Sequence, residues 1–207
     1  MGSSWARRVK AGIVSIVTTW GVISMAPAAA EVAIRPVAHD ARDGRPFAIV
    51  DKRRATLSVY AADGRLVGRT SALLGLTPGD AEPASARGKA PSALGAHERV
   101  TPAGRFEAVP GRNLSGERVV WFNYDANLAI HRLRPAPAGQ RRPERLVSVN
   151  AQDHRITLGC VVVDPAFFDE VVLPTLGNGS SLVYILPERE PLSVAGGGAP
   201  VHAAAAP

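Results

Sequence analysis

Short apolar runs, some of them alternating with polar side chains, recur along the middle of the chain, and each predicts a strand. Residues 47–50 are wholly apolar, residues 55–60 alternate, and residues 65–70 form the third run. An Asp-Gly pair at positions 63 and 64 separates the last two, and this pair accepts the positive φ values of a tight hairpin turn. The pattern therefore predicts an early β-hairpin, with residues 71–76 continuing the sheet.

Further strands of this kind are predicted downstream. They lie at residues 105–109, 117–122, 127–131, 146–149, 155–163 and 181–186. Many short strands with little helix are typical of a mainly β domain with one or two short helices, built as a sandwich or a partly closed barrel.

The one clear helix is predicted to begin at Asp164-Pro165. The Asp carboxylate can accept bonds from the free N–H groups of the first turn, and Pro suits the first helical position. The apolar side chains expected to form its inner face are Phe168, Val171, Val172 and Leu176. Pro174 is expected to bend or end the helix.

Two long segments lack a strand pattern. Residues 77–99 are rich in Gly, Pro, Ala and charge, and so long a loop in a compact domain is usually functional or mobile, as a lid over a site would be. Residues 132–145 form a Pro- and Arg-rich insertion, predicted to be a solvated loop.

The ends of the chain predict export. Residues 1–30 read as a signal peptide, with a basic start, an apolar stretch at 11–26 and small residues before Glu31. We expect a leader at 31–45, one domain at 46–188, and a disordered Ala/Gly/Pro tail at 189–207. The mature protein is then exported, to the periplasm or cell-wall space, with no membrane span.

Charge narrows the set of partners. The whole chain has a formal net charge of +6, and loss of Arg7, Arg8 and Lys10 with the signal peptide leaves it only mildly basic. No basic stripe is interleaved with aromatic residues, so nucleic-acid binding has little support. An anionic polymer such as a cell wall remains a possible partner.

Cys160 is the one cysteine of the chain, so it cannot form an internal disulfide. A lone thiol in an oxidising compartment is buried, paired with another molecule or reactive. It follows Gly159 at the end of an apolar run, where a turn can expose a thiol beside backbone N–H groups. Burial as a structural cysteine is the alternative to use as a nucleophile.

A cysteine nucleophile needs a partner that takes its proton, most often histidine. His154 is six residues away, roughly 20 Å along one continuous strand. His131 closes a predicted strand and can lean over a neighbouring strand end, so it is the preferred partner, with a surface histidine as the alternative. His97 lies in the long loop, and the remaining two lie near the ends.

Other chemistries have weak support. No Cys or His pair has the spacing of metal ligands, so neither a metal nor another cofactor is expected. No Gly-x-Ser-x-Gly motif is present for a serine hydrolase.

Several segments resemble the YkuD-type L,D-transpeptidases, whose signature is a histidine, a variable gap and then Ser/Thr-x-Gly-Cys. The matching segments are Ala-Ile-His ending at His131, Thr157-Leu-Gly-Cys160, the opening hairpin at 48–68, and Thr-Pro-Ala-Gly-Arg-Phe at 101–106. The resemblance covers residues 47–187, essentially the whole predicted domain.

The resemblance implies a cysteine-dependent acyltransferase of peptidoglycan biosynthesis. Cys160 would attack the carbonyl after the L-centre of diaminopimelate in a stem tetrapeptide, D-alanine would leave, and an amine of a second stem would complete a 3→3 crosslink. His131 would carry the proton, Thr157 would orient the site, and the Gly159 and Cys160 N–H groups would line the oxyanion hole.

The chain also departs from the family pattern. Arg132 replaces a common Gly, Leu158 replaces a second His, and Val162 stands where relatives often have Arg or Asn. Arg132, Arg134 or Arg155 could bind substrate carboxylate instead, with Arg132 and Arg155 preferred.

Three alternatives remain open. Water or a free D-amino acid could resolve the acyl-enzyme, which would give an L,D-carboxypeptidase or an enzyme that releases wall-linked proteins. A catalytically silent wall-binding protein would keep the fold without the reaction. A thiol redox protein is disfavoured because no resolving cysteine exists. A monomer is expected.

Overall fold

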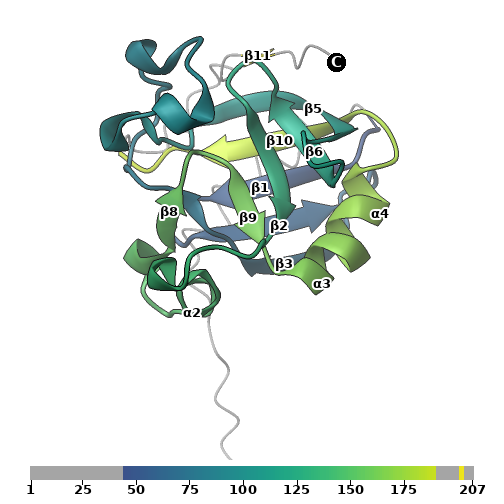
Figure 1. Cartoon of the computed structure of the whole chain (residues 1–207). Helices are drawn as coiled ribbons and strands as arrows, with labels where there is room; N and C mark the ends of the chain where they lie inside the picture. The colour runs from purple at the N-terminus through teal and green to yellow at the C-terminus, as the bar shows by residue number, and fades with distance from the viewer. Residues whose placement is uncertain (1–43, 190–200, 203–207) are drawn as a thin grey trace, which may run out of the picture.

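The computed structural model describes residues 44–189 and 201–202. Strands are the main regular structure of this region and the helices are short, as Figure 1 shows, so the predicted mainly β class is confirmed. The strands are β1 (Phe47–Asp51), β2 (Thr56–Tyr60), β3 (Leu66–Ser71), β4 (Leu74–Gly75), β5 (Gly104–Arg112), β6 (Arg118–Asn123), β7 (Leu128–Arg132), β8 (Arg155–Thr157), β9 (Val161–Val163), β10 (Ser181–Leu186) and β11 (Val201–His202). The predicted signal peptide, and the predicted leader and tail apart from residues 44–45, 189 and 201–202, lie outside the described residues.

The predicted hairpin is present as β2 and β3, which pair antiparallel. Asp63 and Gly64 make its turn, in which the Gly64 N–H donates to Ala61 O at 2.9 Å. Gly64 has a φ of +85°, which a side chain would strain. Residues 71–76 do not extend this sheet as predicted, because β4 leaves it and pairs in parallel with β8.

The main sheet runs in the order β3-β2-β1-β10-β5-β6-β7-β9. Its bend lies in β5, whose first half pairs with β10 and whose second half pairs with β6. The two ends of the sheet then approach each other, and Leu73, just after β3, exchanges two backbone hydrogen bonds with Val162 of β9, at 2.7 and 3.0 Å. This bridge nearly closes the sheet into a barrel.

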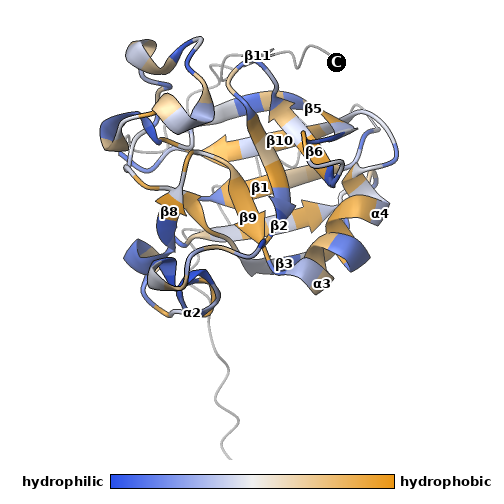
Figure 2. Cartoon of the chain, in the orientation of Figure 1, coloured by the Kyte–Doolittle hydropathy of each residue, from blue (hydrophilic) through white to orange (hydrophobic). Residues whose placement is uncertain are grey.

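The core fills the inside of the bent sheet. Fully buried side chains from strands far apart in sequence meet there, among them Val50, Leu57, Phe106, Phe122, Ile130 and Val161. Figure 2 shows much of this division by colour, since the strands are largely orange, whereas α2 and the loops beside it are largely blue. The opposite faces of β1, β2 and β10 are buried as well, in a second cluster that contains Phe47, Ile49, Tyr60, Leu182 and Tyr184. The outer face of β7 is less covered, since His131 is only half-buried.

The predicted helix packs on one opening of the barrel (Figure 1). It comprises α3 (Pro165–Phe167), a π-helical turn (Phe168–Val172) and α4 (Leu173–Leu176). The Asp164 carboxylate accepts from the N–H groups of Ala166 and Phe167 at 2.9 and 3.2 Å, which confirms the predicted cap. Three of the four predicted inner residues are fully buried, and Val171 packs on the core partly buried. The helix does not end at Pro174 but continues to Leu176. Its π-helical turn ends at Val172, two residues before Pro174, which has no N–H to donate to a preceding carbonyl.

The predicted strand at 146–149 is wrong. The end of the insertion instead folds as α2 (Arg142–Leu146), whose last residue, Leu146, was expected to be the first of the strand. Leu146 is buried against Leu73 and Val162, whereas Val147 and Val149 are exposed. The predicted single strand at 155–163 is also split, into β8 and β9, by the turn that carries Cys160.

Candidate active site

Cys160 occupies a turn between β8 and β9 that side-chain hydrogen bonds hold in shape. The Thr157 hydroxyl accepts from the Gly159 N–H at 3.1 Å and donates to the Cys160 carbonyl at 2.7 Å. The Thr157 hydroxyl thus bridges the two ends of the turn. The bond also occupies the Gly159 N–H, so in this structure that group is not free to face an oxyanion.

Gly159 is required by the geometry of this turn. Its φ is +131°, a backbone conformation that side-chain-bearing residues rarely adopt. A Cβ at this position would lie 2.7 Å from both Leu128 Cδ2 and the Val100 carbonyl oxygen. The turn can therefore approach the neighbouring backbone closely enough to set Cys160 beside β7.

His131 and Cys160 lie on the same outer face of adjacent strands. His131 pairs with Val162 across the parallel β7 and β9, and Cys160 precedes Val161, the partner of Ile130. Ile130 and Val161 point into the core, so His131 and Cys160 point outward. Cys160 is thus opposite Ala129, offset from His131 by about 7 Å along the strands and about 4.8 Å across them.

The protonation state of His131 follows from its contacts. Its Nδ1 lies 2.8 Å from the Arg132 carbonyl oxygen, which can only accept, so Nδ1 carries the hydrogen and Nε2 has the free lone pair. The pKa of His131 is lowered to about 4, chiefly by burial and also by the charge of Arg134, while the hydrogen bond to the Arg132 carbonyl opposes the shift. The imidazole is therefore neutral at pH 7 and can accept a proton at Nε2.

The thiol of Cys160 faces the hairpin between β6 and β7. Its Sγ–H donates to the Asn127 carbonyl at 3.4 Å, and the Ala129 backbone favours the thiolate. Burial nevertheless raises the thiol pKa, and the charges of Arg134 and Arg142 reduce that shift. Among the described contacts, no hydrogen bond joins this thiol to His131.

Arg134 and Arg142 bring positive charge to the outer face beside Cys160. Arg134 follows β7 and pairs with Glu117 at 3.0 Å, and Arg142 opens α2 and donates to Gln140 at 2.6 Å. Both belong to the Arg-rich insertion, which the sequence predicted only as a solvated loop. Arg134 was considered from the sequence, but Arg142 was missed, because its approach depends on α2 folding back over Val162.

The two arginines preferred from the sequence have partners elsewhere. Arg132 points to the opposite face of β7, pairs with Asp169 at 3.2 Å and lies 5.8 Å from the ring centroid of Phe168. Arg155 is buried and binds Glu188 and the Lys52 carbonyl. In this structure neither guanidinium reaches the face that carries Cys160.

The long loop at 77–99 is folded into three short 3₁₀ turns, at Ala84–Ala86, Pro91–Ala93 and Ala96–Glu98. The Glu98 carboxylate pairs with Lys89 at 2.6 Å and accepts from the Gly95 N–H at 2.8 Å. Bonds from Lys89, Ser85 and Gly95 lower the Glu98 pKa to about 2. The loop lines a small cavity of about 20 Å³ with Leu128 and Leu158, next to the Cys160 turn.

The described region meets neither the requirements of a membrane-spanning helix nor those of a metal site. No helix within it is long and apolar enough to span a bilayer. No three His, Cys, Asp or Glu side chains within it gather as metal ligands would.

No protein-family model matches the chain, and no curated protein matches it in sequence. Several solved structures are similar. The catalytic domain of the Enterococcus faecium L,D-transpeptidase is 15% identical over 69% of this chain and 98% of that one, with a TM-score of 0.41. An L,D-transpeptidase from Mycobacterium smegmatis is 12% identical over 69% and 58%, with a TM-score of 0.41. The helical cell shape determining protein Pgp2 from Campylobacter jejuni is 14% identical over 74% and 55%, with a TM-score of 0.46.

Proposed function

We propose that the chain is a peptidoglycan L,D-transpeptidase of the periplasm or cell-wall space, with Cys160 as nucleophile. One observation carries the proposal: Cys160 and a neutral His131 share the outer face of adjacent strands, at a turn whose shape requires Gly159. The motif resemblance described above supplies the substrate class.

The proposed reaction starts with transfer of the thiol proton to His131. Rotation about the Cα–Cβ bond of Cys160 would take Sγ from the Asn127 carbonyl toward Nε2, the imidazole nitrogen that is free to accept. The thiolate then adds to the carbonyl at the L-centre of the donor tetrapeptide. The C–N bond breaks, D-alanine leaves with the proton from His131, and a thioester remains.

Resolution of the thioester decides the product. An amine of a second stem peptide would attack the thioester carbonyl, lose its proton to His131 and release the Cys160 thiol, leaving a 3→3 crosslink. Water in the same position would give an L,D-carboxypeptidase. Both outcomes use the same two side chains.

Arg134 and Arg142 are the proposed carboxylate-binding groups in place of Arg132 and Arg155. Their charges already act on the thiol, so a carboxylate bound to them would lie beside the reacting sulfur. A planar guanidinium matches a carboxylate, and Arg142 is partly buried, which strengthens such a contact.

A second candidate is a catalytically silent wall-binding protein. The observation in its favour is the resting thiol, which donates to Asn127 and has a raised pKa. Such a thiol is a poor nucleophile unless a bound substrate or a side-chain rotation brings it to His131.

Incubation of the purified protein with a disaccharide-tetrapeptide, followed by mass analysis, tests these proposals. We expect loss of D-alanine together with a crosslinked dimer, and we expect Cys160→Ala and His131→Ala to abolish both. Loss of D-alanine without dimer would identify a carboxypeptidase. Unchanged substrate, with no acyl adduct on Cys160, would overturn the enzymatic proposal and favour the binding protein.

A further inference from the structure

Thr101 lies three residues before the start of β5 and is fully buried beneath the Cys160 turn. Its hydroxyl has two backbone partners, the Gly75 N–H at 2.8 Å and the Gly159 carbonyl at 2.9 Å. The Gly75 N–H can only donate, so the hydroxyl accepts from it. The single hydrogen of the Thr101 hydroxyl therefore goes to the Gly159 oxygen.

The bond to Gly159 orients a peptide group that Cys160 shares. The Gly159 C=O and the Cys160 N–H belong to one planar trans peptide, in which they point in opposite directions. A hydrogen bond that fixes the carbonyl therefore fixes the N–H as well. The Cys160 N–H points away from Thr101, and it donates to no other group within residues 44–189.

The neighbouring amide of the turn is already used, because the Gly159 N–H donates to Thr157. The Cys160 N–H, in contrast, remains available for a developing negative charge beside the thiol. An oxyanion donor stabilises a transition state only if its direction is set in advance.

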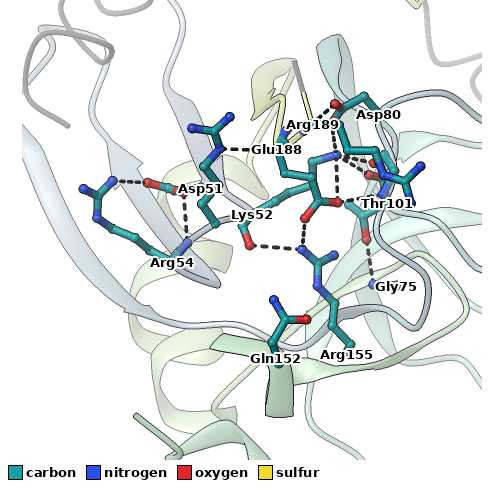
Figure 3. A network of polar contacts seen from close by, with 12 residues as sticks. Asp51, Lys52, Arg54, Gly75, Asp80, Thr101, Gln152, Arg155, Glu188 and Arg189 are labelled. Atoms are coloured by element: carbon teal, nitrogen blue, oxygen red, sulfur yellow. Dashed lines mark hydrogen bonds and ion pairs between the residues drawn. The ribbon is translucent and has the colours of Figure 1, made fainter. Parts of the chain in front are cut away.

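Thr101 is itself held firmly. Its carbonyl accepts from the buried Lys52 ammonium at 3.0 Å, and Lys52 also binds Asp80 at 2.7 Å, as Figure 3 shows. On the other side, Gly75 has no room for a side chain, since a Cβ there would lie 2.6 Å from the Thr101 nitrogen. The hydroxyl therefore has little freedom to leave the Gly159 carbonyl.

We propose that Thr101 is a positioning residue, which aims the Cys160 N–H at the oxyanion formed when the Cys160 thiolate adds to a carbonyl. In that step the sulfur–carbon bond forms and the π electrons of the carbonyl move to its oxygen, which accepts from the Cys160 N–H. The inference rests on the acyl-transfer chemistry of the proposed function, but not on the identity of its substrate.

Two small electrophiles isolate this role. p-Nitrophenyl acetate acylates a thiol through an oxyanion, whereas iodoacetamide alkylates it without one. The ratio of the two rates, measured on the same sample after subtraction of the Cys160→Ala rate, reports oxyanion stabilisation alone. Iodoacetamide is thus an internal reference for the amount and reactivity of the thiol.

The variants are Thr101→Val, which keeps the shape without the hydroxyl, and Thr101→Ser, which keeps the hydroxyl. Thr101→Ala is a second hydroxyl-free variant, for use if Val is not accommodated. The matched control is Ser181→Ala, because Ser181 is buried in β10 and its hydroxyl contacts the Leu176 carbonyl rather than the Cys160 turn.

We expect the acylation-to-alkylation ratio to fall about tenfold or more without the hydroxyl, since loss of one oxyanion donor typically costs 10²–10³-fold and here the donor is only misdirected. Thr101→Ser should restore the ratio, and Ser181→Ala should leave it unchanged. An unchanged ratio in the hydroxyl-free variants would overturn the inference. If the ratio falls while the wild-type protein leaves the disaccharide-tetrapeptide intact, the proposed function fails and the role of Thr101 stands.

Discussion

Cys160 and His131 form a neutral pair in the resting protein. Burial raises the thiol pKa, and it is the main cause that lowers the imidazole pKa to about 4. Both shifts disfavour a charged thiolate–imidazolium pair. In the proposed reaction, proton transfer from the thiol would therefore have to accompany attack on the substrate. Arg134 and Arg142 offset part of this cost, because their charges favour the thiolate.

The low pKa of His131 predicts a pH-dependent stability. The pKa is about 4 in the folded protein and 6.5 for an unperturbed histidine, so between these values the unfolded chain binds the extra proton. Stability should therefore rise from pH 4 to pH 6.5, by about 3 kcal/mol at 1.36 kcal/mol per pKa unit. His131→Asn should flatten this rise, measured by urea unfolding at pH 4.5, 5.5, 6.5 and 7.5.

The carboxylates titrate in a separate range. The pKa values of Asp80 and Glu98 are lowered to about 2, so their contributions are lost only as the pH falls below about 4.5. Glu98→Gln is the control, and it should not change the rise in the free energy of unfolding between pH 5 and 6.5. If the free energy of unfolding rose equally with pH in wild type and His131→Asn, the inference that burial keeps His131 uncharged would be wrong.

At the scale of elements, the insertion between β7 and β8 supplies part of the site. Leu146 of α2 covers Val162 and Leu73, which makes an apolar residue suitable at position 162. The same short helix begins with Arg142, whose charge reaches the thiol. Val162 is therefore apolar because α2 covers it, and the positive charge near the thiol comes from Arg142 of the same helix.

Arg142→Gln should make the thiol less reactive at neutral pH. Loss of a partly exposed charge is worth about 0.5–1 kcal/mol, so iodoacetamide alkylation at pH 7.5 should slow about two- to fivefold. At a pH high enough to ionise the thiol fully, the variant and wild type should react equally.

Arg142→Lys keeps the charge and is the matched control, with alkylation close to wild type. The electrostatic role of α2 would be refuted if Gln and Lys variants slowed alkylation alike, since that pattern would reflect altered packing.

At the scale of the whole molecule, one buried ionic network joins distant segments. Lys52, at the end of β1, binds Asp80 of the long loop and the Thr101 carbonyl, and Glu188, after β10, lies 3.6 Å from its ammonium (Figure 3). Arg155 adds the start of β8 to the same network through Glu188. The segments that carry the Cys160 turn are thus tied to the rest of the barrel.

Lys52→Met should destabilise the fold strongly. Its side chain is fully buried, and its removal leaves the carboxylates of Asp80 and Glu188 without their ammonium partner. Breaking one partner of a buried ion pair typically costs about 3–5 kcal/mol in the free energy of unfolding, which urea denaturation measures. Arg54→Ala, which removes an exposed pair with Asp51, should cost less than about 1 kcal/mol. A Lys52→Met protein as stable as wild type would contradict a structural role for the network.

The sequence by itself determined the local parts of this protein. The turn at Gly64, the strands beside it, the cap at Asp164 and the Gly-Cys turn each depend on a few adjacent residues, and each was predicted. Thr157, Gly159 and Cys160 could be grouped for the same reason. The preference for His131 over His154 also came from the sequence, because distance along a strand follows from residue count.

Only the tertiary structure decided which distant groups meet. Thr101 and Gly159 are 58 residues apart, and Leu73 reaches Val162 only because the bent sheet nearly closes. The fold also gives Arg132 and Arg155 their partners Asp169 and Glu188, and it brings Arg142 near the thiol. Local propensity carries no information about such contacts, since they depend on how the buried faces of separate strands pack together. The sequence was thus enough to propose Cys160 as a nucleophile, whereas the charges around it and the hydrogen bond beneath its turn depend on the fold.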